Sequence, residues 1–482
     1  MKQGWRVRLN EHDLGLLHRD ENDMLIGSAI PAGTLKDGPN SLVVELPKSE
    51  TADDIRIGEI RLIETSRSEL FSQTTLRVEV RDSVSGQLTP ARITLRDSKG
   101  TLQDSGALSN DHMAVRPGTI YSGDGLAEIP VRAGRYVVTA GRGFEYSIDT
   151  AEVDLEQGKP QLVKLNLRRE VPTEGYAACD THVHTRTHSG HGDSTVQERM
   201  LTLAAEGIEL PIATDHNVHI DHEPFAREMG VRKYFTPVIG NEYTTKIGHF
   251  NIFPIVPDSP VGNHRLNDWA EIFPEIDRVR GVKAVILNHA RDLHSGVKPF
   301  GPKLFNEASG DNVHDWQLRA NAMEVVNSSA NQTDIMQLFR DWMTLLNRGH
   351  QMTPVGSSDS HDVARHFVGQ GRTYIRCDDS DPGNIDVEEA VSNFVQGRVM
   401  VSFGLLTEMQ IDGKYGPGEV ARVSGEMVSA KIRVLAPHWI DASEVQLYAN
   451  GELIRSEPIG PVDRNLPLDQ KLPTGVKWQG EW

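Results

Sequence analysis

Two histidines separated by one residue, His182 and His184, lie in the segment Asp180–Thr185 and could bind a metal ion. Side chains alternate between the two faces of a strand, so both imidazoles would point the same way if this segment ends a strand. Neutral imidazoles are common ligands of transition metals. The spacing therefore predicts one side of a metal site, whose other ligands must come from other elements of the chain.

Ionisable residues also follow several other apolar runs that have the composition of strands. Residues 282–287 are almost wholly apolar and lead directly into Asn288 and His289. Helical periodicity appears between such runs, for example over residues 197–207. Apolar strands that end in ionisable residues and are joined by helices are typical of a β/α barrel with its site on one face. The other groups of this kind are Asp215-His216-Asn217, Asn241-Glu242, Glu324 within 322–326, and Asp359-Ser360-His361.

The pattern of elements divides the chain into four regions. Residues 1–70 predict a small or partial β-domain. Residues 71–170 predict a β-sandwich, and their order of elements resembles carboxypeptidase-regulatory or immunoglobulin-like modules. Residues 171–405 carry the barrel pattern, and residues 406–482 predict a C-terminal β-domain that is short or truncated. The predicted fold is thus an α/β barrel flanked by all-β, sandwich-like domains, with structural or docking roles for the flanks.

Two local signals in the flanking regions predict particular elements. Residues 60–63 are apolar and β-branched enough to form a strand. Asn450-Gly451 lies between two strand-like runs and predicts a tight hairpin, because both residues tolerate positive φ angles.

Composition excludes several classes of function. The formal net charge of −18 over 482 residues argues against a basic nucleic-acid-binding surface. Only two cysteines are present, Cys179 and Cys377, so a disulfide framework is not expected and Cys179 is predicted to be a small buried residue. No apolar run is long enough to predict a membrane span, and the first residues lack the apolar core of a signal peptide. The localisation is left open between the cytoplasm and export.

The order of the motifs resembles that of the PHP (polymerase and histidinol phosphatase) superfamily. The sequences of the segments Ser189–Asp193 and Glu206–Pro211 are most similar to those of CehA/McbA-type metallohydrolases. The resemblance covers residues 175–405 and implies a distorted seven-stranded β/α barrel with two or three divalent transition-metal ions, Zn, Mn or Fe. The motifs that carry it are Asp180–Thr185, Ala213–Asn217, Gly240–Glu242, Asn288-His289 and Asp359–His361.

The resemblance also implies the ligands of each ion. Glu242 would bridge the first and second ions, which is chemically reasonable because one carboxylate can bind two cations. His188 and His191 are alternative candidates for one metal-ligand position, and the sequence Ser189-Gly190-His191, which looks more like the family's pattern, favours His191. The implied ligands are His182, His184 and Asp359 for the first ion, His289 and His249 for the second, and His191, His216 and His361 for the third.

Other residues near these motifs have two interpretations. Glu324 could bind a metal directly or support the barrel floor and the ligands. Arg365 and Arg372 could bind an anionic substrate or pair with surface carboxylates. Arg291-Asp292 directly follows His289 and could support it. The remaining histidines are expected at the surface or in the core.

The predicted chemistry is hydrolysis by a metal-bound hydroxide. The Gly-x-Ser-x-Gly motif of a serine nucleophile is missing from the sequence, whereas bound divalent ions lower the pKa of a water ligand toward neutrality. Asp359 or a nearby histidine could move the proton. His294 is a candidate acid for the leaving group.

The sequence leaves the substrate open between two classes of small molecule. The PHP resemblance implies a phosphoester, and the CehA/McbA resemblance implies a carboxylic or carbamate ester. Neither nucleic acid nor membrane is an expected partner, while the β-domains could contact a glycan or a protein. The alternative function is a non-catalytic glycan- or partner-binding protein with a metal-stabilised barrel, but the complete set of ligand types favours an enzyme.

Overall fold

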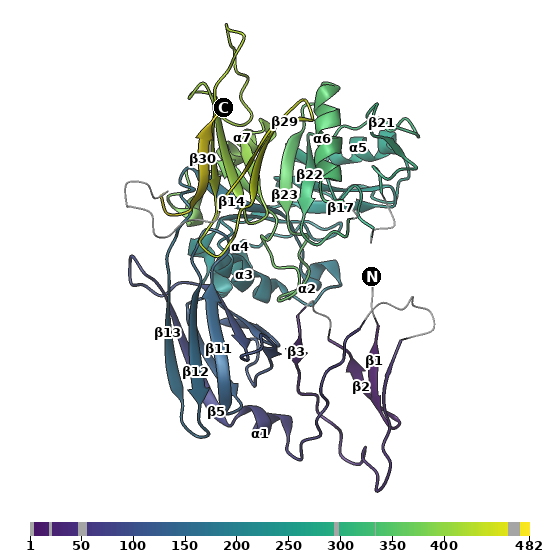
Figure 1. The fold of residues 1–482 in the computed structure, drawn as a ribbon. Helices are drawn as coiled ribbons and strands as arrows, with labels where there is room; N and C mark the ends of the chain where they lie inside the picture. The colour runs from purple at the N-terminus through teal and green to yellow at the C-terminus, as the bar shows by residue number, and fades with distance from the viewer. Residues whose placement is uncertain (1–3, 19–21, 47–54, 294–297, 333, 461–472) are drawn as a thin grey trace.

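The structure, a computed structural model, is a mixed α/β fold built mostly from strands (Figure 1). It describes residues 4–18, 22–46, 55–293, 298–332, 334–460 and 473–482. None of the helices within these ranges is long and apolar enough to cross a membrane.

The N-terminal strands form a small antiparallel sheet in the order β2-β1-β4. Most of its side chains are exposed or half-buried, and Leu9 is its buried residue. The prediction of a strand at residues 60–63 is wrong, because these residues are exposed and have no regular secondary structure. The sheet consists of β1 (Arg6–Leu9), β2 (His12–Leu16) and β4 (Leu42–Glu45).

Two sheets between residues 74 and 167 share one apolar core. Strand β5 alternates buried and less buried side chains, as expected for a strand with one face on a core. Leu76 and Val80 from β5 meet Ile93 and Val138 from the other sheet in this core. One sheet is ordered β10 (Leu126–Val131), β5 (Thr74–Asp82), β13 (Gln161–Leu167). The other is ordered β12 (Asp149–Leu155), β11 (Gly134–Gly141), β6 (Ala91–Arg96), β7 (Leu102–Gln103), β3 (Met24–Leu25), with β9 (Thr119–Ser122) beside β6 and β8 (Met113–Arg116) beside β9.

Two five-stranded mixed sheets follow and carry the predicted site. The first is ordered β16 (Val238–Ile239), β15 (Leu210–Ala213), β14 (Tyr176–Val183), β24 (Arg372–Arg376), β25 (Val399–Ser402). The second is ordered β17 (Asn241–Thr245), β18 (Gly248–Phe253), β19 (Ala284–Leu287), β22 (Ala322–Asn327), β23 (Thr353–Ser357).

Two isolated bridges join these sheets, Val183 to Ser360 and His216 to Glu242, and both lie among the predicted ligands. These pairings do not show a seven-stranded β/α barrel. They show two curved sheets that meet at the ends of β14, β15, β17 and β23.

Short helices cover the sheets and bring ligand-bearing loops into place. The helix predicted over 197–207 is present as α3 (Val196–Ala205), whose N-terminus is closed by a capping box between Thr195 and Glu198. Gly207 follows with a φ of 65°, which is the conformation expected of a helix stop. The other helices are α1 (Arg67–Phe71), α2 (Arg186–Ser189), α4 (Glu223–Glu228), α5 (Trp269–Asp277), α6 (Gln337–Asn347) and α7 (Val387–Val395), with 3-10 turns at Arg232–Tyr234 and Pro382–Asn384.

The C-terminal region contains a three-stranded sheet and a hairpin. Asn450 and Gly451 connect the hairpin strands with φ angles of 52° and 89°, so the predicted tight turn is present. The sheet is ordered β26 (Leu406–Ile411), β27 (Ala430–Leu435), β30 (Val476–Glu481), and the hairpin pairs β28 (Glu444–Ala449) with β29 (Glu452–Pro458).

A short antiparallel pairing of β20 (Phe305–Asn306) with β21 (Asp311–Asn312) lies in the segment between β19 and β22.

Candidate metal centre

The predicted ligands come together at the meeting point of the two five-stranded sheets. His182 is the last residue but one of β14, and the strand alternation places its ring 4.9 Å from that of His184, measured between ring centroids. Glu242 lies in β17, His184 directly follows β14 and His191 lies between α2 and α3, while the remaining ligands come from β18 or from segments that follow β15, β19 and β23. They are His249 on β18, His216 after β15, His289 after β19, and Asp359 and His361 after β23.

Glu242 lies at the centre of this cluster and is almost fully buried. Its Oε1 lies 3.0 Å from His249 Nδ1, 3.3 Å from His289 Nε2 and 3.4 Å from His182 Nε2. Its Oε2 contacts His216 Nδ1. Burial opposes ionisation of this carboxyl, but His216, His249 and His182 outweigh it and hold the pKa of Glu242 well below its usual range. One carboxylate is therefore shared among imidazoles from four segments of the chain.

Asp359 makes a second bridge between the paired histidines. Its Oδ1 lies 3.2 Å from His184 Nε2 and 3.3 Å from His182 Nε2. Asp359 adopts a φ of 53°, and the nearby His289 a φ of 25°, both in the left-handed region that costs non-glycine residues energy. Both residues follow strands of the second five-stranded sheet, and strained backbone of this kind is common at functional sites.

Three histidines of the cluster each have one nitrogen in a hydrogen bond, while the other nitrogen forms none with the described residues. The buried Nε2 atoms of His182, His184 and His361 have no hydrogen-bond partner among the described residues. Their Nδ1 atoms instead contact Glu324 Oε1 at 2.6 Å, Ser189 Oγ at 3.2 Å and the Asp359 carbonyl at 3.0 Å, respectively. Buried polar atoms are rarely left unpaired, and an imidazole held at Nδ1 presents an Nε2 lone pair to a metal. The residues present therefore fit divalent cations.

The electrostatics of the paired histidines differ because their neighbours differ. Burial lowers the pKa of His184 well below its usual value, and His361 and His216 add to this effect. Burial also acts to lower the pKa of His182, but the carboxylates of Asp359 and Glu324 outweigh it and raise that pKa well above its usual value. A neutral His184 can bind a metal ion without first losing a proton. A cation bound beside His182 would neutralise the charge of the surrounding carboxylates.

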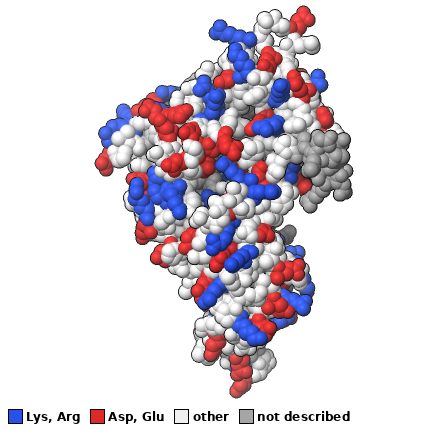
Figure 2. All heavy atoms as spheres, turned by 90° about the vertical axis from the view of Figure 1, so that its left-hand side faces the viewer, with Lys and Arg blue, Asp and Glu red and all other residues white. Residues whose placement is uncertain are grey.

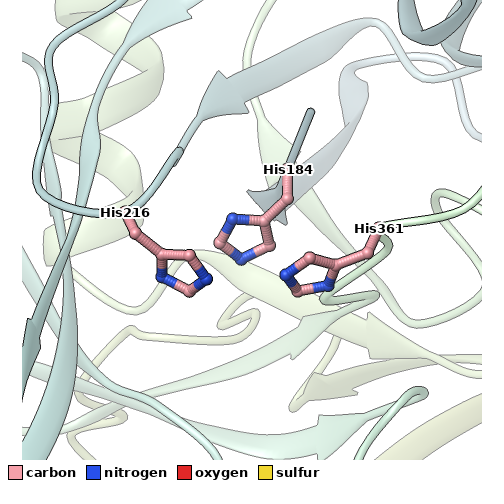
Figure 3. Close-up of side chains that lie close together, drawn as sticks. All are labelled: His184, His216 and His361. Carbon is pink, nitrogen blue, oxygen red and sulfur yellow. The ribbon is translucent and has the colours of Figure 1, made fainter. Parts of the chain in front are cut away.

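Within the described part of the chain, four sets of three ligand atoms lie close enough to hold an ion. In each set the atoms lie within 4.8 Å of one another, and the sets overlap through shared residues. Figure 3 shows the rings of His184, His216 and His361 facing a common space from three different segments. The sets are His184, His216, His361; His182, His289, Asp359; His182, His184, Glu242; and Glu242, His249, His289.

His191 and His188, the two candidates for one position, lie in different surroundings. His191 Nε2 lies 2.9 Å from His216 Nε2, and its ring stacks on His361 with centroids 4.4 Å apart. His188 instead has its ring 6.1 Å from that of Phe225. The structure thus brings His191, and not His188, against the cluster.

Glu324 supports the cluster through hydrogen bonds. It is fully buried, and besides His182 it accepts hydrogen bonds from Ser357 Oγ at 2.6 Å, the His289 amide at 2.5 Å and Asn327 Nδ2 at 2.9 Å. Burial opposes its ionisation, but His182 lowers the pKa of Glu324 to about 2. Of the two predicted roles for Glu324, the hydrogen bonds favour support of the ligands.

Asp215 and Asp180 are supporting residues whose role the sequence motifs did not reveal. Asp215 accepts hydrogen bonds from the Thr185 amide at 2.7 Å and from Ser189 Oγ at 2.6 Å, and so fixes the segment after His184. Asp180 accepts from the amides of His182, Ser358 and Gly369 at 3.1, 3.1 and 2.7 Å. Asp215 directly precedes His216 and Asp180 lies two residues before His182, so their positions in the motifs were the available signal, but the sequence does not show which groups they contact.

Several other predicted residues lie away from the cluster or outside the description. His294 falls outside the described residues. Arg372 is buried and donates to the carbonyls of Gly369 and Glu206, so the predicted pairing with a surface carboxylate is wrong, while substrate binding stays a prediction. Arg291 pairs with Asp341. Cys179 is fully buried, as predicted, and burial raises the pKa of its thiol well above the usual value.

Comparisons with known proteins give no close relative. No protein-family model matches the sequence, and no curated protein matches it. A two-domain protein from Bacteroides vulgatus ATCC 8482 containing a predicted PHP-like metal-dependent phosphoesterase is similar in structure with a TM-score of 0.36 and 17% identity, over 61% of this chain and 85% of that chain. The major pilin subunit BcpA of Bacillus cereus has a TM-score of 0.17 and 12% identity over 20% of this chain and 30% of that chain. Scores this low carry no argument about activity, so function has to be argued from the site.

Proposed function

We propose that this chain is a metal-dependent hydrolase of small-molecule esters. The observation that supports the proposal most strongly is that the buried Nε2 atoms of His182, His184 and His361 form no hydrogen bond with the described residues. Those of His182 and His184 lie 3.4 and 3.7 Å from the carboxylate oxygens of Glu242. An unpaired buried nitrogen costs free energy unless a ligand completes it. Divalent ions at this position would polarise the bond to be cleaved and lower the pKa of a bound water.

The chain's own residues would then hold the ions and handle protons. His182, His184 and Asp359 would form one position, His249 and His289 a second, and His191, His216 and His361 a third, with Glu242 shared between the first two. Asp359 would also accept the proton of the attacking water, because its Oδ1 already lies between two ligand imidazoles. The contacts within the cluster support these assignments, and the division among three ions follows the PHP resemblance.

The sequences of the motifs support membership of this chain in the PHP superfamily, with most similarity to the CehA/McbA type. The fold that goes with this proposal is a seven-stranded β/α barrel. On this proposal the domain boundaries lie near residues 70, 170 and 405, and 71–170 is a β-sandwich that flanks the catalytic domain. The substrate is a phosphoester or a carboxylic or carbamate ester.

A substrate panel tests the proposed reaction. The protein is stripped with a chelator, reconstituted separately with Zn, Mn and Fe, and assayed on nitrophenyl phosphate, nitrophenyl acetate and a nitrophenyl carbamate. We expect metal-dependent hydrolysis of at least one class, abolished in Glu242→Gln and unchanged in His350→Asn, an exposed histidine outside the cluster. Reconstituted protein that binds metal yet hydrolyses none of the three would contradict the proposal and favour a binding protein.

A further inference from the structure

Helix α3 lies between the two sheets of residues 74–167 and the two five-stranded sheets that carry the metal-ligand cluster (Figure 1). Its buried side chain Met200 shares one apolar core with Ala114 and Tyr121 from the sheets of residues 74–167. Val183 of β14 belongs to the same core. The helix is therefore in a position to hold segments that carry metal ligands.

Arg199 on α3 is fully buried, which is an uncommon place for a cation. Figure 2 shows acidic and basic side chains side by side on the surface, where an ion pair contributes little to stability. Burying a guanidinium group costs far more free energy unless hydrogen-bond acceptors surround it. The acceptors of Arg199 therefore indicate what this buried charge does in the fold.

Three of the acceptors of Arg199 are main-chain carbonyl oxygens beside the proposed ligands. Its Nε donates to the His184 carbonyl at 3.0 Å. Its Nη2 donates to the carbonyls of Ser360 at 3.0 Å and Asp362 at 3.2 Å, the two residues on either side of His361. One planar guanidinium thus joins the segment after β14 to the segment after β23.

These two segments also contact each other at the atoms that Arg199 binds. The His184 amide donates to the Ser360 carbonyl at 3.1 Å, and this oxygen has two lone pairs, so it accepts from Arg199 as well. The rings of His184 and His361 stack with their centroids 4.0 Å apart. The separation of the two imidazoles therefore depends on the contact to which Arg199 donates.

The helix end that carries Arg199 is itself held in place from outside the cluster. Glu198, the preceding residue, closes the capping box of α3 with Thr195. It also accepts hydrogen bonds from Arg116 Nη1 at 2.8 Å and from Ser109 Oγ at 2.6 Å, both within the region of residues 74–167. Arg199 therefore extends toward the ligand segments from a fixed first turn of the helix.

We propose that Arg199 is a positioning residue of the metal centre, whose guanidinium sets the separation of His184 and His361 for a shared ion. It acts through the main chain of the ligand segments and supplies no ligand atom. The inference rests on the proposed function, in which both histidines bind metal. Removal of Arg199 should therefore weaken metal binding although every ligand side chain is still present.

Cobalt binding to the full chain tests this role, because the visible absorption of bound Co(II) reports the geometry of its ligands. The metal-free protein is titrated with Co(II) in competition with a fluorescent chelator. In Arg199→Met the affinity should fall about 10–100-fold, as for other groups that orient ligands, and the absorption per bound ion should change. Arg199→Lys should lose less affinity, because it keeps a charged donor but not the planar fork.

Arg232→Met is the control variant. Arg232 Nη1 donates to the carbonyls of Phe235 at 2.8 Å and Gly383 at 2.6 Å, so it also joins two segments, but outside the cluster. We expect wild-type affinity and absorption in this variant. Wild-type affinity in both Arg199 variants, or an equal loss in Arg232→Met, overturns the proposal. If Arg199→Met does not fold, the comparison of Arg199→Lys with Arg232→Met decides by the same criteria.

Hydrogen exchange of the metal-free proteins separates failure of this proposal from failure of the proposed function. A wild type that binds less than one Co(II) per chain would refute the proposed function, and exchange then decides the role of Arg199. The His184 amide, which donates to the Ser360 carbonyl, should exchange faster in Arg199→Met than in the wild type or in Arg232→Met. In that case, equal exchange in all three proteins would overturn the positioning role.

Discussion

At the level of single residues, the contacts of the histidine Nδ1 atoms decide what the cluster can bind. His182 is held through Nδ1 by Glu324, and this leaves its Nε2 directed toward Glu242 and Asp359. A carboxylate on the far nitrogen fixes both the tautomer and the orientation of a ligand imidazole. The fully buried Glu324 thus acts on the proposed metal through His182.

Replacing Glu324 with Gln should weaken metal binding by about 10–100-fold, because the variant keeps the shape but loses the charge that orients His182. A competition titration against a fluorescent chelator measures this affinity. Glu228→Gln, an exposed glutamate on α4, is the matched control. An unchanged affinity in Glu324→Gln would show that His182 needs no such support.

The sequence predicted the residues of the cluster better than their partners. His182, His184, Glu242 and Asp359 follow from type, spacing and strand ends, and the structure brings them together. The role of Arg372 could not be predicted, because its partners are backbone carbonyls at Gly369 and Glu206 that no side-chain pattern reveals.

At the level of elements, the loop between α2 and α3 holds His361 in place. The His361 carbonyl accepts hydrogen bonds from the amides of Asp193 and Ser194, each at 3.2 Å. Gly192 has a φ of 81°, and a Cβ on it would lie 2.5 Å from the His361 carbonyl oxygen. The absence of a side chain at Gly192 is therefore needed for the close approach of the two segments.

Gly192→Ala should displace His361 and reduce the number of bound metal ions per chain. Gly190→Ala is the matched control, since Gly190 has a φ of 78° and a Cβ there would meet nothing within 4 Å. In both variants an alanine must adopt the left-handed backbone conformation, which lowers the free energy of unfolding by about 1–2 kcal/mol. Elemental analysis should show fewer ions only in Gly192→Ala, and equal metal content in the two variants would refute this role of Gly192.

Element types were predicted more accurately than sheet closure. The periodicity of residues 197–207 and the turn at Asn450-Gly451 are local signals, and both elements are present. The pairing of strands is set by contacts between distant segments, such as the bridge from Val183 to Ser360, which local patterns do not encode. Residues 60–63 have the β propensity of a strand but pair with no neighbouring strand in the described structure, and they form no strand.

At the level of the whole molecule, ion pairs connect the sheets of residues 74–167 to helix α3. Arg116 on β8 lies 2.8 Å from Glu198 Oε1 and 3.0 Å from Asp193 Oδ1. Glu198 also closes the capping box of α3. Burial opposes ionisation of Glu198, but hydrogen bonds from Arg116 and Ser109 lower the pKa of its carboxyl to about 2.

This lowered pKa predicts how the pair contributes to stability as pH changes. A carboxyl with a folded pKa below its unfolded value of about 4.3 stabilises the fold above that pH, and the contribution is lost as pH falls toward 2. Glu198→Gln should therefore unfold at lower urea than the wild type at pH 7. The difference in the free energy of unfolding should shrink as pH falls from about 4.5 to 2. Chemical denaturation at several pH values measures this, and a difference that stays constant would exclude the ionised pair as its cause.

The central claim is that Glu242 organises a centre of more than one metal ion. The most direct measurement is the metal-to-protein ratio, by elemental analysis, of wild type and Glu242→Gln after reconstitution with Zn and with Mn and removal of excess ion. We expect at least two ions per chain in the wild type, because the described residues form four ligand sets, and Glu242, His182, His184 and His289 each belong to two of them. This expectation includes a clear fall in Glu242→Gln. Less than one ion per wild-type chain, or the same ratio in both proteins, would contradict it.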